Sequence, residues 1–436
     1  MFCADEAPFV TNASRINGWV AQPNTRGTLD IVWSSLFTIF ICTFTLLCLN
    51  LPAPKDTEWQ WTRRRLWWML LAIAGPEFVL TAACGQLGTA QESVAAFKEL
   101  DYPQWTVRHG FFADMGGFLF EPRDGIPFPV TSKHIHWLVS RGYLKFPNVD
   151  EKEIIDKSKQ DTVAKLISCF QIGYLMVNCL GRAGQNLAIT TLELSVLAVV
   201  VCSIATSLCW LRKPANVLTP IRLPTTMSME EILQDAGVSD LVWKQTPLDF
   251  IDDLGPSWAL NIQVFMKWPV GPHERPMPRF GNDRFPNLNG KYETLLCFAT
   301  LIYAAIHLAG WNFTFPTRAE RILWRASSMF LMVSTIVFWL CETVAAWHRK
   351  GRWQRLYYRV FDPEKMAEAE FARQLSLSKK EPKPMPLVWE FWAITPLAIM
   401  YAWARGYIVL EAFIGLRSLE PSAYLNVEWS NYVPHI

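Results

Sequence analysis

Residues Leu66–Cys84 read LWWMLLAIAGPEFVLTAAC, an apolar run that is long enough to cross a bilayer and contains one carboxyl group, that of Glu77. An ionisable side chain at that depth is costly, so it marks a candidate functional site. Glu193 lies in a second apolar run, Leu187–Leu211, and His307 lies in a third, Thr294–Phe315. Together the three groups predict a polar cavity inside a bundle of membrane helices.

Four further runs of about span length complete the predicted bundle. They are Ile31–Leu49, Leu166–Gly181, Ala326–Trp347 and Leu387–Leu416. The expected fold class is an all-α integral membrane protein with about seven transmembrane helices. The last run contains Pro396 as well as charged residues, so we expect it to be kinked, partly interfacial or divided into two shorter pieces.

Three long polar regions, residues 85–165, 212–293 and 348–386, separate these runs and fall on one face if all seven helices span. The chain then divides into a polar N-terminal segment (1–30), transmembrane helices with the insertion 85–165 (31–211), an extramembrane loop region (212–293), two transmembrane helices (294–347), a charged loop or interfacial helix (348–386) and a last membrane segment with its tail (387–436). Basic residues beside the spans place the polar regions in the cytosol, although Arg63–Arg65 oppose this orientation.

The composition fits a multi-pass membrane protein with sizeable polar parts, because 51% of the residues are hydrophobic and the mean hydropathy is +0.13. A net charge of +2, without a basic stripe interleaved with aromatic residues, argues against nucleic-acid binding. The ten cysteines form no Cys-x-x-Cys pair and read as apolar fillers. The expected partners are membrane lipids and a lipophilic small molecule, in the endoplasmic reticulum or another endomembrane.

Two buried acids are the leading catalytic candidates. Pro76 opens the helical ladder beside Glu77, and burial favours a neutral carboxyl group that can give up a proton. Glu193 follows Thr190 and Thr191, whose hydroxyls can satisfy it locally, and it is the candidate second carboxylate. For both acids the alternative is a packing role, with hydrogen bonds to a neighbouring helix.

Other polar and aromatic residues are weaker candidates. His109 and Asp114 lie in WTVRHGFFADMGGF (Trp105–Phe118), either as polar groups that cap a cavity or as charges of an interfacial helix. His307 is either a substrate contact or a satisfied core histidine. The aromatic residues Trp68, Trp105 and Trp311 are candidates for lining the substrate site, against the alternative of an aromatic belt at the membrane interfaces.

The clustered carboxylates of Asp249, Asp252 and Asp253 are candidate ligands of a Mg²⁺ ion that would bind a diphosphate. Their order is Asp-x-x-Asp-Asp, which differs from the Asp-Asp-x-x-Asp of soluble terpene synthases, so a solvated loop is the favoured interpretation. The sequence also lacks a P-loop, a Gly-x-Ser-x-Gly and a His-Glu-x-x-His motif. We therefore expect neither a metal nor a redox cofactor.

Several blocks of the sequence resemble a large family of fungal multi-pass membrane proteins, most without an assigned role, some of which accompany secondary-metabolite pathways. These blocks are Gly18–Thr57, GPEFVL (Gly75–Leu80), Trp105–Phe118, DKSKQD (Asp156–Asp161), ITTLEL (Ile189–Leu194) and WNFTFPTRAERILWR (Trp311–Arg325). Within that neighbourhood the chain is similar to membrane-bound terpene cyclases of meroterpenoid pathways, such as the ring-forming step that leads to ascofuranone. The resemblance implies that an acid in the membrane triggers ring closure on an oxidised farnesyl chain attached to an aromatic ring.

Two rival functions remain open at this point. A transporter or exporter of a lipophilic metabolite would use the same buried acids as a proton relay. A non-enzymatic seven-helix receptor or structural membrane protein would use its large polar regions for docking partners. The sequence shows no internal repeat, which weakens the case for an inverted-repeat transporter.

Overall fold

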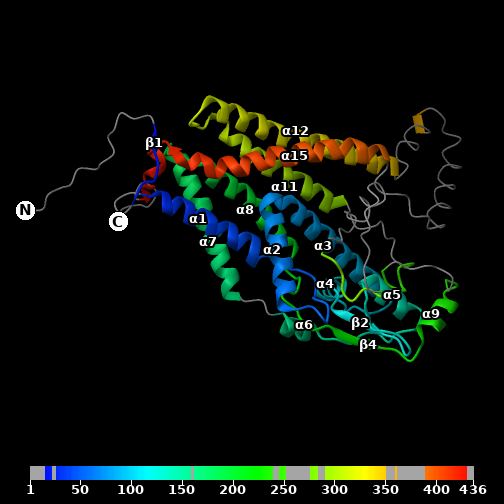
Figure 1. Cartoon of the computed structure of the whole chain (residues 1–436). Helices are drawn as coiled ribbons and strands as arrows, with labels where there is room; N and C mark the ends of the chain where they lie inside the picture. Colours follow the sequence, from blue (N-terminus) through cyan, green and yellow to red (C-terminus); the bar gives the residue numbers. More distant parts are fainter. Residues whose placement is uncertain are drawn as a thin grey trace, which may run out of the picture.

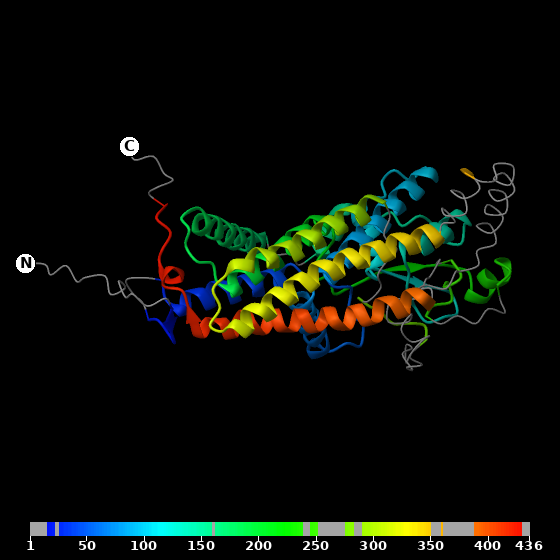
Figure 2. The same ribbon diagram turned by 90° about the horizontal axis from the view of Figure 1, so that it is seen from above.

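The computed structural model describes residues 15–21, 26–158, 162–238, 245–251, 275–282, 290–349, 359–360 and 388–429. Long helices dominate it, and α11, α12 and α15 run side by side along the length of the molecule (Figures 1 and 2). The long helices and their extension are α1 (Thr28–Phe40), the π-helix η1 (Ile41–Thr45), α2 (Glu58–Ala74), α3 (Pro76–Glu99), α7 (Thr162–Gly184), α8 (Thr191–Cys209), α11 (Gly290–Ala309), α12 (Arg318–Arg349) and α15 (Val388–Ile414).

Five segments of these helices are long and apolar enough to cross a membrane. They are Thr28–Thr45, Thr191–Cys209, Lys291–Asn312, Arg318–Val344 and Trp392–Arg417. Each overlaps one of the predicted runs, and the last shows that α15 continues through Pro396 as one helix. The described chain is therefore mostly helical, with five candidate spans, or six if the bent pair α2 and α3 is one span.

The stretch Leu66–Cys84 does not form the single straight span that we predicted. It belongs to two helices, α2 and α3, whose axes differ by 111°. The break falls at Gly75, which ends α2, and Pro76 occupies the first turn of α3, where its missing N–H costs no hydrogen bond. In Figure 1 the two helices meet at a sharp angle, beneath α11 and α15. Glu77 thus lies in the first turn of a helix and not in the middle of one.

The predicted span Leu166–Gly181 forms most of α7. The candidate spans found among the described residues do not include this helix. Five candidate spans, or six with the bent pair, are therefore identified, and a count of about seven stays a prediction.

The first two polar regions fold together and are not simple loops. They form what we call the extramembrane unit, which contains α4 (Val107–Asp114), β2 (Phe118–Glu121), β3 (Phe128–Pro129), α5 (Ser132–Ser140), α6 (Glu151–Lys157), β4 (Ile221–Pro224) and α9 (Met229–Asp235). Strand β2 pairs antiparallel with β3 and parallel with β4, so the sheet joins both regions. Phe97, Phe118, Leu223 and Ile232 share its core. The all-α prediction therefore needs this small sheet added.

Local sequence signals account for several of these elements. Ser228 caps α9, because its hydroxyl accepts from the Glu231 N–H while the Glu231 carboxylate accepts from the Ser228 N–H. Near the two ends of the described chain, β1 (Ile16–Asn17) pairs antiparallel with β5 (Ser418–Leu419). The short helices η2 (Gly310–Asn312), η3 (Gly415–Arg417) and η4 (Pro421–Tyr424) complete the described elements.

Candidate functional site

Two helices each present a pair of polar side chains four residues apart toward the break between α2 and α3. Helix α11 contributes Tyr303 and His307, and α15 contributes Tyr401 and Arg405. A spacing of four residues puts both members of a pair on one helix face. Together with Glu77 of α3, these side chains form what we call the break-site cluster.

Arg405 fastens α15 to the end of α2. Its Nε donates to the Ala74 carbonyl oxygen and its Nη2 to the Ile73 carbonyl oxygen, both at 3.1 Å. These carbonyls belong to the last turn of α2, where the ladder leaves them without partners inside the helix. The remaining Nη1 lies 2.8 Å from His307 Nε2, and the guanidinium stands 5.1 Å from the centre of the Tyr303 ring. Arg405 is 4% exposed, so a buried cation caps the broken helix.

His307 has both ring nitrogens engaged. Its Nδ1 lies 2.9 Å from the carbonyl oxygen of Tyr303, one turn earlier on α11. A carbonyl can only accept and a guanidinium can only donate, so Nδ1 carries the hydrogen and Nε2 accepts from Arg405. His307 is therefore the neutral Nδ1–H tautomer, and it is fully buried.

Glu77 has one engaged and one unengaged carboxylate oxygen. Its Oε1 accepts from the Tyr401 hydroxyl at 2.8 Å, while its Oε2 is buried without a hydrogen-bond partner. The Tyr303 hydroxyl is also buried without a partner. Glu77 and Arg405 lie within electrostatic range of each other, yet the salt bridges of the described residues do not include one between them.

The break is accessible from the surface of the helix bundle. Ala74 and Phe78 on either side of it are exposed, and Glu77 is partly exposed although its Oε2 is not. Next to it lies a small pocket, whose lining comes from η1 with its flanks, α2, α3 and α8 and includes Pro76. The lining residues are Cys42, Leu46, Leu47, Ala72, Pro76, Val79, Ser203, Thr206 and Trp210. The pocket therefore reaches the break through Pro76, and Glu77 is not among its lining residues.

Glu193 lies in a different set of contacts. Its Oε1 pairs with Arg26 Nη2, and its Oε2 accepts from the N–H and the hydroxyl of Thr190, at 3.0 and 2.9 Å. Thr190 in turn caps α8, so Glu193 completes a capping box. The local satisfaction by Thr190 agrees with the packing alternative for this acid. Within the described chain, the hydrogen bonds of Glu193 do not connect it to the break-site cluster.

His109 and Asp114 hold the extramembrane unit together. His109 Nδ1 accepts from the N–H of Thr106 at 3.2 Å, and its Nε2 donates to the Val149 carbonyl at 2.9 Å. Asp114 Oδ1 accepts from the N–H of Ser132 at 2.8 Å, at the start of α5. The structure thus places these two candidates in loop-to-helix contacts and not at the break-site cluster.

The three candidate tryptophans lie in three different environments. Trp68 of α2 is buried in the same core cluster as Tyr303. Trp105 is buried in the extramembrane unit, where it stacks on Phe97 with ring centres 4.1 Å apart and donates to Ser93 Oγ at 3.1 Å. Trp311 is 37% exposed and carries the Arg325 guanidinium 5.1 Å from its ring centre. Only Trp68 shares a core with a member of the break-site cluster.

Of the three clustered aspartates, only Asp249 lies among the residues that the structure describes. Asp249 accepts from the N–H groups of Gln245 and Thr246, at 2.7 and 2.9 Å, as a turn residue does, while Asp252 and Asp253 lie outside the described residues. Over the described ranges, His, Cys, Asp and Glu form no group of three suited to a metal ion.

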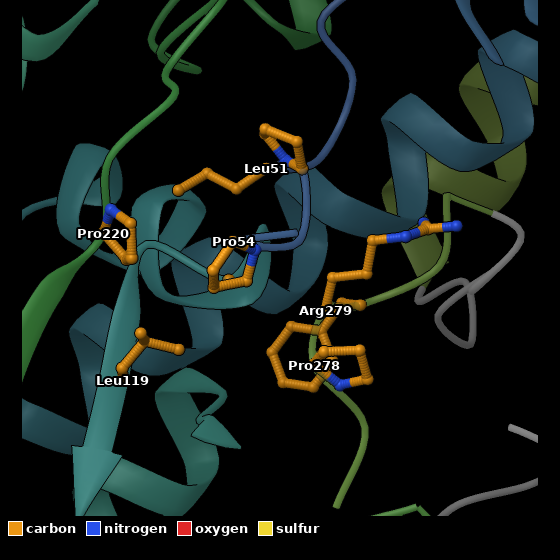
Figure 3. A pocket seen from close by; sticks show the side chains of 9 residues that line it. Leu51, Pro54, Leu119, Pro220, Pro278 and Arg279 are labelled. Atoms are coloured by element: carbon orange, nitrogen blue, oxygen red, sulfur yellow. The ribbon is translucent and has the colours of Figure 1, made fainter. Parts of the chain in front are cut away.

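A second pocket, of about 230 Å³, belongs to the extramembrane unit and not to the break. Prolines dominate its wall, and Figure 3 shows Pro54, Pro220 and Pro278 around it with Arg279 at one side. Arg279 Nε lies 3.6 Å from Asp56 Oδ2. The pocket has no buried acid among its lining residues, so the break-site cluster remains the candidate for chemistry.

Sequence reasoning found Glu77 and His307 but did not assign Tyr303, Tyr401 or Arg405 to the site. A signal for them was present, because an arginine inside an apolar run is as costly as an acid there. The two spacings of four residues, from 303 to 307 and from 401 to 405, were also readable. What the sequence did not contain was the contact between α15 and the break.

Comparison with known proteins gives a family and no activity. The model of a family of unknown function (DUF8562) matches residues 2–254 and 288–436. The chain therefore belongs to this family. No curated protein and no solved structure matches the chain.

Proposed function

We propose that this protein is an integral-membrane terpene cyclase that closes a ring on an epoxidised or hydroxylated prenyl-aryl substrate of meroterpenoid type, in fungal secondary metabolism. The observation that carries the proposal is the carboxyl group of Glu77, whose Oε2 is buried and unpartnered at the helix break. The resemblance in GPEFVL, which contains this acid, points to the same chemistry.

The environment of Glu77 suits a general acid. An ionised carboxylate that is buried without a cationic partner is strongly disfavoured, so the neutral form prevails. Because Tyr401 donates to Oε1, Oε2 is the atom left to carry the proton. A carboxylic acid held neutral in this way can protonate an oxygen of the substrate.

In the proposed reaction, the Oε2–H of Glu77 gives its proton to the epoxide oxygen while a C–O bond of the epoxide breaks. The resulting cation is attacked by a double bond or a hydroxyl group of the same chain, which closes the ring. A proton then leaves the product and returns to Glu77, so the product is an isomer of the substrate. Tyr401 and the nearby Arg405 charge stabilise the carboxylate while it exists.

The position of the break suits a lipophilic substrate. The exposed flanks Ala74 and Phe78 open toward the surface of the bundle, so an apolar molecule can approach from the bilayer. The small pocket beside Pro76 marks the proposed place where the prenyl chain approaches the break.

In the proposed reaction the proton returns to Glu77 and not to Glu193, the second carboxylate that the sequence suggested. Both oxygens of Glu193 are occupied by Arg26 and Thr190. A carboxylate in a buried ion pair is a poor proton acceptor, because protonation would leave its partner charge unpaired.

A second candidate function is transport of a lipophilic metabolite. The observation in its favour is the 111° break between α2 and α3, with an acid and a capped helix end beside it, since broken helices of this kind form binding sites in transporters. Uptake of labelled compound into vesicles without chemical change would decide for transport.

The test of the cyclase proposal is incubation of microsomes that contain the protein with prenyl-aryl epoxides and diols, followed by a search for a cyclised product. Epoxides should give an isomer of unchanged mass, and Glu77→Gln should lower product formation by roughly two to four orders of magnitude, the span for losing general acid catalysis. The matched control is Glu99→Gln, which changes an exposed acid at the other end of the same helix. Full activity of Glu77→Gln at equal protein level would remove this acid from the reaction.

A further inference from the structure

Arg405 is a buried cation whose partners in the described structure are all neutral. Its three nitrogens go to two backbone carbonyls and to the His307 ring. A carboxylate is a stronger partner for a guanidinium than any of these, because both groups are then charged. Glu77 lies within electrostatic range and has a free oxygen, Oε2, yet the two are not paired. Some feature of the structure must therefore keep them apart.

The His307 ring supplies that feature. Its hydrogen bond to the Tyr303 carbonyl fixes the Nδ1–H tautomer, so the Nε2 lone pair points at Arg405 Nη1, 2.8 Å away. The ring is fully buried on α11, and in this orientation both of its nitrogens have partners. The carbonyls of Ala74 and Ile73 accept from Nε and Nη2 of Arg405, and His307 Nε2 accepts from its Nη1.

We propose that His307 is a positioning residue that holds Arg405 against the end of α2 and away from Glu77, so that Glu77 keeps its proton. Without the ring acceptor, Nη1 would be a buried donor lacking a partner, and Glu77 Oε2, which has no partner either, would accept from it once ionised. Pairing them would turn the carboxylic acid into a carboxylate. The role of this protonation in catalysis rests on the proposed function. The positioning role of His307 does not, because the protonation of Glu77 can be measured without turnover.

The charge of Glu77 is influenced by titratable groups on three neighbouring helices. They are Cys202 of α8, Tyr303 of α11, and Tyr401 and Arg405 of α15, and His307 of α11 contacts Arg405. Arg405 is the sole cation among them at neutral pH, since His307 is neutral. The protonation of Glu77 therefore depends on where this one guanidinium is held.

The experiment uses the full chain in lipid nanodiscs and infrared spectroscopy at pH 7. The C=O band of a protonated carboxylic acid at position 77 is identified as the band that Glu77→Gln removes. His307→Phe keeps an aromatic ring against Tyr303 but removes the acceptor, and we expect it to reduce this band about tenfold or more. His307→Gln should keep the band, because its amide oxygen can accept from Arg405 while its NH₂ group donates to the Tyr303 carbonyl.

A folded His307→Phe variant with the full Glu77 band would overturn the proposal, because a purely structural histidine would lower stability and leave the band unchanged. If that variant does not fold, the parent chain decides the question. A protonated Glu77 together with a neutral Nδ1–H His307, read from ¹⁵N chemical shifts, supports the proposal, and an ionised Glu77 or an imidazolium overturns it. If the band behaves as expected but no candidate substrate is cyclised, the positioning role stands and the proposed reaction fails.

Discussion

The ion pair between Arg26 and Glu193 allows a prediction that separates a structural acid from a catalytic one. The Glu193 side chain is fully buried and the Arg26 side chain is 9% exposed. Glu193→Gln preserves an oxygen for the two Thr190 hydrogen bonds but leaves the Arg26 guanidinium without its anion. Arg182, a second buried guanidinium, lies within electrostatic range of Arg26, so the loss leaves two cations facing each other.

The expected cost of this substitution is about 3 to 5 kcal/mol of the free energy of unfolding, the range for removing one partner of a buried pair. Removing both charges, in Arg26→Gln combined with Glu193→Gln, should cost clearly less than Glu193→Gln alone, since no charge of the pair then remains buried and unpaired. The measurement is denaturant unfolding of the purified chain in detergent micelles, followed by tryptophan fluorescence.

Turnover by the folded variant completes this test. Because Glu193 has no part in the proposed proton transfer, its folded Gln variant should cyclise epoxides at the parent rate. A variant that keeps its stability within about 1 kcal/mol, the reach of a weak exposed pair, but loses turnover would refute the structural interpretation and restore Glu193 as the second acid.

Two further predictions concern the break and the junction between the helices and the extramembrane unit. A methyl group at Gly75 would lie 2.6 Å from Phe78 Cδ2 and 3.1 Å from Glu77 Oε1. Gly75→Ala should therefore displace the acid and lower the rate of cyclisation by about 100-fold. The control is Gly173→Ala, where nothing lies within 4 Å of the added methyl group, and it should leave that rate unchanged. Burial lowers the pKa of Lys213 to about 8, although its Nζ donates to the Cys48 carbonyl at 2.6 Å. Because this pKa lies below the ordinary value of 10.5, the unfolded chain binds more protons between pH 8 and 10.5, and stability should rise with pH across that window. At about 1.4 kcal/mol per pH unit, the free energy of unfolding should gain roughly 3 kcal/mol across this window. Unfolding curves at several pH values should show this gain in the parent chain and its loss in Lys213→Met. The same pH dependence in both proteins would mean that the lysine is solvated.

The sequence by itself determined the helical class and most of the spans, because apolar length is a local property. Five predicted runs overlap helices that reappear as candidate spans. It also identified Glu77 and His307, since an ionisable group in an apolar run is visible without any knowledge of its neighbours. The identity of the reaction came from resemblance and stays a prediction.

The tertiary structure alone decided which polar residues act together. Gly75 and Pro76 were visible in the sequence, but the 111° bend depends on how α3 packs against α8 and α11. From the sequence both Glu77 and Glu193 were candidate acids, with Glu193 slightly the weaker one because Thr190 and Thr191 could satisfy it locally. The fold brought Arg405 and Tyr401 to the first and Arg26 to the second. Arg26 and Glu193 are separated by 167 residues, and Tyr401 and Glu77 by 324. A pairing across such distances depends on the packing of whole helices, so local patterns carry no record of it, and the protonation of each acid follows from that pairing.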